Sequence, residues 1–201
     1  MLTQRIISVL ALLFFIAGPA LGQSLTLNTQ GAQEMHIYGD SNIKKWDAAV
    51  NQVSGSLTLQ NIENLTAENL TAENFQSLSL TVPVEQIESE SGGLTSNIHK
   101  YLKGDDYPNI TFQLNNVTDI TEQNGSLLIT ASGVVNAAGS DNPVEMQVTA
   151  DLTDGGIQFS GAQELLMTNF NIDPPTAVFG TIRSKDEFRV EFNVNFGQEG
   201  V

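Results

Sequence analysis

The chain has 201 residues, with 23 acidic against 8 basic side chains, two histidines and no cysteine. Without cysteine, a disulfide framework, a thiol nucleophile, a Cys-ligated zinc site and a lipidated N-terminal cysteine are all excluded. The formal charge of −15 disfavours binding to nucleic acid and attraction to an anionic membrane surface, because Lys and Arg carry both interactions. A hydrophobic content of 40% is too high for a disordered chain.

Residues 1–22 have the three-part layout of a secretory signal peptide. Arg5 is the only charge in this stretch, and the 12-residue run Ile6–Ala17 is apolar except for one serine. Small residues stand three and one positions before the predicted cleavage at Gln23. A retained membrane anchor is the alternative, but a spanning helix needs roughly 20 apolar residues. We therefore expect a mature domain of residues 23–201, periplasmic or secreted, with no membrane span.

The mature chain shows the alternation of apolar and polar residues that is typical of β-strands. From Glu187 to Phe196, five apolar side chains alternate with five polar ones, which gives one apolar face. Turn sequences such as Asn124-Gly125 and Asp154-Gly155-Gly156 separate further candidates. The other predicted strands are Leu57–Leu59, Leu78–Val84, Ile110–Leu114, Leu127–Thr130, Val144–Leu152, Ile157–Phe159 and Leu165–Met167. Short antiparallel strands with one apolar face each predict an all-β barrel or sandwich.

Two segments depart from the strand pattern. Leu94–Lys103 is predicted to be a short helix in a connection, with Thr95 or Ser96 as its N-cap and Gly104 as its stop. In Asn64–Asn74 the sequence NLTAE occurs twice. We interpret this duplication as an insertion in a surface loop, because loops absorb added residues at low cost.

The sequence offers little support for catalysis or metal binding. His36 lies in a strand-like run and His99 on the predicted helix, and both positions favour a structural role. The spacing of two histidines alone does not indicate a metal site. Asp151–Gly156 lacks the further oxygen ligands of a calcium loop and is better explained as a hairpin turn. We expect no catalytic residue, no metal and no cofactor.

The basic residues of the mature chain gather mainly in pairs. No Lys or Arg lies between Lys45 and Lys100, or between Lys103 and Arg183. The pairs are Lys44/Lys45, Lys100/Lys103 and Arg183/Lys185. Coincidence among so few residues is one explanation. The other is our hypothesis that some pairs meet at one rim of the barrel, near the polar end of a ligand, with Lys100, Lys103, Arg183 and Lys185 as rim residues.

Five motifs in a fixed order resemble the YceI-like family, which is described as polyisoprenoid-binding with a lipocalin-like barrel. They are GDSNIKKWD (39–47), SLSLTVPVEQIES (77–89), LTSNIHKYLKGDDYPNITFQL (94–114), GSLLITASGVV (125–135) and ELLMTNFNIDPPTAVFGTI (164–182). Each motif alone is weak, but together they cover most of the mature chain. The stretch Ala137–Asn142 departs from the family, because it lacks the Thr-Lys or Thr-Arg that often follows the central Gly segment. The NLTAE duplication is a second departure.

The resemblance implies an antiparallel lipocalin-like barrel of about eight strands with one short helix. It also implies non-enzymatic binding or carriage of a long-chain isoprenoid in the barrel interior. The scarcity of bases favours a neutral, quinone-like head over a polyprenyl phosphate. The residues predicted to line the apolar lumen are Leu80, Val82, Phe112, Leu114, Met146, Val148, Phe159, Met167, Phe170, Phe188, Val190 and Phe192. An eight-strand barrel can either hold one small ligand or fill itself with side chains, and the sequence does not separate these cases.

Three other classes of protein stay open. An outer-membrane barrel would turn its apolar face outward and should carry Tyr/Trp girdles, whereas this chain has one Trp and three Tyr. A structural or adhesive secreted domain would have a packed core and no ligand. A hydrolase would have to use His36 or His99 with carboxylates, and no substrate suggests itself. Trp46 is interpreted as a core anchor rather than a lid.

Overall fold

The computed structural model describes residues 23–177 and 179–198, so the predicted signal peptide lies outside the described residues. The strands are β1 (Ser24–Thr29), β2 (Glu34–Ser41), β3 (Trp46–Val50), β4 (Ser54–Gln60), β5 (Phe75–Pro83), β6 (Ile87–Glu88), β7 (Asn109–Gln123), β8 (Ser126–Ala137), β9 (Ser140–Thr153), β10 (Gly156–Leu166), β11 (Thr176–Ala177) and β12 (Ile182–Gly197). This part of the chain also holds the helix α1 (Gly92–Tyr101) and the short 3-10 helices η1 (Ala72–Asn74), η2 (Val84–Gln86) and η3 (Met167–Phe170).

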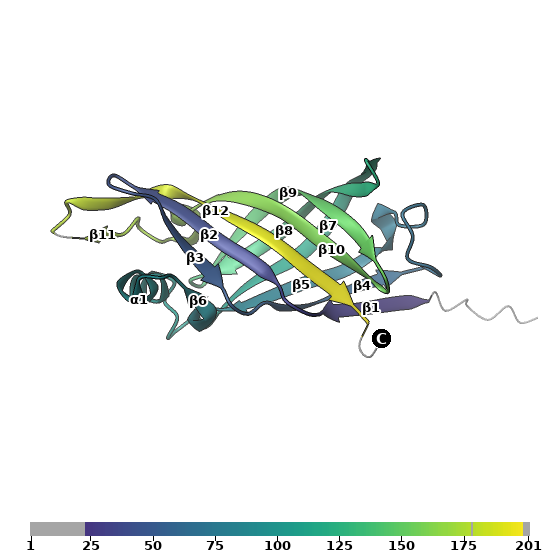
Figure 1. Cartoon of the computed structure of the whole chain (residues 1–201), viewed down its shortest axis with the longest axis horizontal. Helices are drawn as coiled ribbons and strands as arrows, with labels where there is room; N and C mark the ends of the chain where they lie inside the picture. The colour runs from purple at the N-terminus through teal and green to yellow at the C-terminus, as the bar shows by residue number, and fades with distance from the viewer. Residues whose placement is uncertain (1–22, 178, 199–201) are drawn as a thin grey trace, which may run out of the picture.

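Eight antiparallel strands close into a barrel (Figure 1). Their order is β1, β4, β5, β7, β8, β9, β10 and β12, and β12 pairs back to β1. Where β1 ends, β2 continues along the same edge of β12, and β3 and β6 follow β2. The predicted barrel, with one α-helix in a connection of the described chain, is therefore confirmed.

The two ends of the barrel differ in their connections (Figure 1). The end that we call the α1 end carries the β2–β3 turn, the β5–β7 connection with α1, the β8–β9 turn and the β10–β12 connection. The opposite end carries the β7–β8 and β9–β10 turns and the β4–β5 connection. Asn124 and Gly125 of the β7–β8 turn have φ values of 55° and 90°, as a two-residue type I′ hairpin turn requires. The Asn-Gly signal in the sequence is thus confirmed.

The helix α1 begins earlier and ends earlier than predicted. Its N-cap is Ser91 rather than Thr95 or Ser96. The Thr95 hydroxyl is used differently, because it bonds both the backbone N–H and the carbonyl oxygen of Ser89 and so ties α1 to β6. At the other end, Lys103 adopts the left-handed conformation (φ 54°), and the N–H of Gly104 donates to the carbonyl oxygen of His99 at 2.9 Å. The helix thus stops just before the predicted glycine.

Several strand boundaries also differ from the predicted ones. Val84 belongs to η2 rather than to β5, and Met167 belongs to η3 rather than to a strand. The predicted strand Ile110–Leu114 is one end of the much longer β7, whose pairing with β8 is interrupted by bulges. The bulges shift the apolar alternation out of phase, which hides the rest of β7 from a period-two pattern.

The duplicated NLTAE sequence crosses the end of the barrel opposite α1. It is a connection, as interpreted, but its side chains contribute to the core. Leu70 and the following Asn74 are buried, and Leu65 packs against the same cluster as Leu70. Asn74 Nδ2 donates to the carbonyl oxygen of Gln60 at 2.9 Å, which fixes the connection to the end of β4. The insertion therefore helps to close this end of the barrel.

In the described part of the chain, no helix is both long enough and apolar enough to cross a membrane.

Candidate ligand-binding cavity

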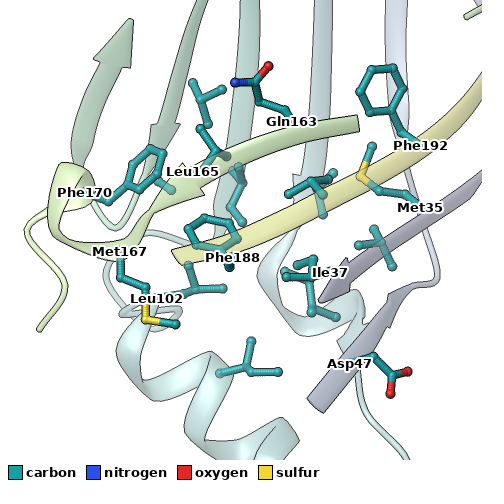
Figure 2. Close-up of a pocket in the computed structure, with 18 of the residues that line it drawn as sticks. Met35, Ile37, Asp47, Leu102, Gln163, Leu165, Met167, Phe170, Phe188 and Phe192 are labelled. Carbon is teal, nitrogen blue, oxygen red and sulfur yellow. The ribbon is translucent and has the colours of Figure 1, made fainter. Parts of the chain in front are cut away.

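A cavity of about 610 Å³ occupies the barrel interior and extends to the α1 end. This volume lies within the range of roughly 300–1,000 Å³ that is typical of small-molecule sites. The barrel is thus hollow, a point that the sequence left open. All twelve residues that the sequence placed in the lumen line this cavity. Figure 2 shows Leu165, Met167, Phe170, Phe188 and Phe192 among the lining side chains.

The alternation of β12 explains how the lining is built. Phe188, Val190 and Phe192 point into the cavity, whereas Glu187, Arg189 and Glu191 are exposed. Successive side chains of a strand point to opposite faces, so a period-two sequence sorts the residues into an apolar lumen and a charged outer wall. On the outer wall, Arg189 Nη2 lies 3.0 Å from Glu191 Oε1.

Gln163 is a polar residue of the cavity lining that was not predicted from the sequence. It lies on β10 in register with Val190, and side-chain alternation puts it on the same face as Phe159 and Leu165, which also line the cavity. Figure 2 shows Gln163 and Leu165. Its Nε2 donates a hydrogen bond to the carbonyl oxygen of Glu164 at 3.1 Å. A signal existed in the sequence, because an amide replaces an apolar residue at an inward position. The lining therefore offers an uncharged hydrogen-bonding group beside apolar walls.

Gly39 and Trp46 explain the spacing within the GDSNIKKWD motif. They are directly paired across β2 and β3, and the Trp46 ring lies over the glycine. A Cβ atom at Gly39 would sit 2.1 Å from Trp46 Cζ2, so a larger residue would displace the ring. Between them, the Ser41 hydroxyl donates to the carbonyl oxygen of Lys44 at 2.7 Å and fixes the turn. Trp46 thus packs against the core and lines the cavity near its α1 end.

Trp46 also carries an unsatisfied group, because its buried Nε1 has no hydrogen-bond partner in the described chain. A buried donor without an acceptor costs about 1–3 kcal/mol. We expect Trp46→Phe to keep the free energy of unfolding within about 1 kcal/mol of wild type, since the smaller ring removes this donor. Trp46→Ala should lose about 3 kcal/mol, because it removes the ring as well. Urea unfolding followed by circular dichroism checks this, and equal losses in both variants would contradict it.

The four predicted rim residues are exposed, and none of them lines the cavity. Lys185 Nζ donates to Asp40 Oδ2 at 2.6 Å, and this bond holds the pKa of the Asp40 carboxyl below its ordinary value. Arg183 Nε donates to the carbonyl oxygen of Gly180 at 3.0 Å, and Lys103 Nζ lies 3.5 Å from the carbonyl oxygen of Ala138. Lys100, the fourth predicted rim residue, lies on α1. The bases that line the cavity at this end are Lys44 and Lys45.

The histidines occupy separate structural positions. His36 is exposed on β2 and stacks on Tyr38 with ring centroids 6.0 Å apart. His99 Nε2 lies 2.8 Å from the carbonyl oxygen of Ile87 and joins α1 to β6. Within residues 23–177 and 179–198, no three His, Asp or Glu side chains are grouped as metal ligands would be.

The chain and its barrel were compared with known proteins. None of the curated proteins compared with the chain matches its sequence. The barrel is similar to BcnA of Burkholderia cenocepacia (14% identity, 81% of this chain and 95% of that chain, TM-score 0.61). It is also similar to a polyisoprenoid binding domain of Saccharophagus degradans implicated in plant cell wall breakdown (9% identity, 86% of this chain and 97% of that chain, TM-score 0.63). A third similar structure is the YCEI protein of Campylobacter jejuni (15% identity, 76% of this chain and 84% of that chain, TM-score 0.56).

At identities of 9–15%, the structural likeness of these proteins supports a shared fold. The sequence itself matches the model of the YceI-like domain over residues 28–196, which is most of the chain and includes the motifs from GDSNIKKWD onward. The chain therefore belongs to the YceI-like domain family.

Proposed function

We propose that the protein binds a long-chain isoprenoid, or a similar apolar lipid, non-covalently inside the barrel and carries it without chemical conversion. The observation that carries this proposal is the apolar cavity of about 610 Å³. Burial of an apolar chain contributes about 25 cal/mol per Å². The similar structure from Saccharophagus degradans is a polyisoprenoid binding domain, which supports the same ligand class.

We further propose an uncharged, quinone-like head. The inward faces of β8, β9 and β10 carry apolar residues and the Gln163 amide. A second N–H of that amide is suited to a quinone carbonyl oxygen. A phosphate head would instead require charged donors, and the bases that line the cavity, Lys44 and Lys45, lie at the α1 end.

The test is mass spectrometry of the lipid extracted from protein purified from its native host. We expect a long-chain isoprenoid with an uncharged head. A polyprenyl phosphate would overturn the proposed head but keep the ligand class. An extract without lipid, together with no binding of added isoprenoids, would overturn the function and favour a structural or adhesive domain.

The single tryptophan gives a second readout, because Trp46 lines the cavity. A long-chain quinone should quench its fluorescence in a saturable titration, and a hydrocarbon of equal chain length should compete. Gln163→Leu should weaken quinone binding about fivefold, the value of one net hydrogen bond, and leave hydrocarbon binding unchanged. Equal effects on both ligands would contradict a role for Gln163 in recognising the head.

Residues 1–22 are proposed to direct export, after which the mature chain begins at Gln23. N-terminal sequencing of the protein from the periplasmic or secreted fraction tests this proposal. A mature protein that still begins at Met1 would contradict it.

A further inference from the structure

Two neighbouring segments at the α1 end carry bases and no acid, although Asp40, Asp47 and Asp186 flank them. The segments 41–46 and 175–185 contain four bases, Lys44, Lys45, Arg183 and Lys185, and none of the 23 acids of the chain. Lys185 is paired with Asp40 of β2. The other three form no ion pair with any described residue. Three bases without an ion pair thus lie on two neighbouring segments of a protein whose net charge is −15.

Large apolar side chains are exposed at the same place. Ile43, at the β2–β3 turn, is 62% exposed, and Phe179, in the turn between β11 and β12, is fully exposed. A single exposed apolar residue is normal, but apolar side chains exposed on adjacent segments form a patch, and such patches mark interaction surfaces. Apolar side chains beside bases are the composition that binds the surface of an anionic bilayer.

Hydrogen bonds join the two turns into one platform. The Asn42 backbone N–H donates to the carbonyl oxygen of Arg183 at 3.0 Å, and its Nδ2 donates to the carbonyl oxygen of Thr181 at 2.9 Å. The Arg183 backbone N–H returns a bond to Asn42 Oδ1 at 2.8 Å. In Figure 1 the β2–β3 turn and the β11 segment project together beyond the barrel at the α1 end. We call residues 41–46, 175–177 and 179–185 the tip platform.

The tip platform also borders the opening of the cavity. Ile43, Lys44 and Lys45 line the cavity, as do Pro175 and Ile182 of the second segment. A surface that approached the tips would therefore face the route by which a lipid enters or leaves.

We propose that the tip platform docks on the surface of an anionic lipid bilayer, with Ile43 and Phe179 entering the interfacial region and the three unpaired bases contacting lipid phosphates. The acidic outer wall would be repelled by the same surface, so the charge distribution also orients the cavity toward the bilayer. Docking by itself does not depend on the proposed lipid ligand. Its role in loading and release rests on the proposed function.

The experiment measures co-sedimentation of the protein as exported by its host with protein-free vesicles. We expect binding to vesicles of phosphatidylglycerol and phosphatidylcholine, little binding to phosphatidylcholine alone, and loss of binding at high salt. Arg183→Gln should weaken binding about fivefold, whereas Arg183→Lys should not. Arg189→Gln, which removes a base from the outer wall, is the matched control and should leave binding unchanged.

The apolar part of the tip platform has its own matched pair. Phe179→Ser should weaken vesicle binding about tenfold or more, because a whole aromatic side chain no longer inserts. Tyr38→Ser removes an exposed aromatic residue from the outer face of β2 and should leave binding unchanged. Phe179 does not line the cavity, so Phe179→Ser should keep the affinity for a soluble short-chain quinone.

Three outcomes would overturn the proposal. The first is equal binding of wild type to anionic and neutral vesicles, and the second is wild-type binding by Phe179→Ser. The third is binding to native membranes but not to protein-free vesicles, which would assign the platform to a protein partner. Vesicle binding by a protein that holds no isoprenoid would overturn the proposed function alone, so the two failures are distinguishable.

Discussion

Ala131→Phe should abolish binding of a long-chain quinone while the barrel stays folded. Ala131 lies on β8, where it is paired with Met146 of the neighbouring strand β9. It is 6% exposed and lines the cavity. A phenyl ring at this position projects into the lumen and occupies volume that the lipid chain would need. We expect the affinity to fall at least tenfold, which corresponds to about 1.4 kcal/mol of lost binding free energy.

The neighbouring residue provides the matched control. Ser132 follows Ala131 on β8 and therefore points to the outer face of the same strand. Ser132→Phe adds the same ring outside the lumen and should bind the quinone as wild type does. Trp46 quenching measures the affinity, and circular dichroism checks the fold of both variants. Because overpacking a core costs about 1–3 kcal/mol, a modest loss of stability is expected for Ala131→Phe.

Unchanged affinity in Ala131→Phe, with the fold intact, would mean that the lipid does not pass through the middle of the barrel. Ligand binding would then be confined to the α1 end, between Trp46 and Ile98. The variant therefore tests the position of the ligand independently of its chemical identity.

The lumen could be predicted from the sequence because side-chain alternation needs no knowledge of strand order. Once Glu187–Phe196 is recognised as a strand, Phe188, Val190 and Phe192 must share one face, whichever strand lies next to it. Closure of the barrel then turns that face inward. This is why the residues placed in the lumen from the sequence line the cavity, although two of them, Met167 and Phe170, belong to a 3-10 helix.

The arrangement of the bases could not be predicted in the same way. Lys44 reaches the cavity because of the β2–β3 turn, and Arg183 lies beside that turn because Asn42 bonds to it from 141 residues away. Such proximity depends on strand register between distant segments, which pairs of neighbouring charges in the sequence do not encode. The three pairs of bases left coincidence and a common rim both open, and only the strand register shows that Lys44 and Arg183 lie on neighbouring segments.

Net charge and local charge lead to different expectations for an anionic surface. A net charge of −15 disfavours an anionic surface only if the charges are spread evenly. Here residues 41–46 and 175–185 contain four bases and no acid, although Asp40, Asp47 and Asp186 flank them, and the proposed docking depends on the unpaired bases among the four. Attraction within a Debye length of about 10 Å depends on this local distribution rather than on the sum.

The NLTAE duplication shows most clearly what local sequence cannot decide. Leu65 and Leu70 have identical neighbours, yet Leu65 is only partly buried, whereas Leu70 is 3% exposed. The difference arises from η1, which begins within the second copy at Ala72 and is fixed to the end of β4 through Asn74. The position of the second copy over the barrel therefore decides which leucine enters the core.

Leu70→Ala should consequently lower the free energy of unfolding by about 2–5 kcal/mol, the range for a buried leucine that leaves a cavity. Leu65→Ala, in the same sequence context, should lose about 1 kcal/mol, because less of its apolar surface is removed from water. Urea unfolding of both variants measures the difference. Equal losses would contradict the difference in burial between the two leucines, whereas a larger loss from Leu70→Ala would support the second copy as the part of the insertion that closes the barrel.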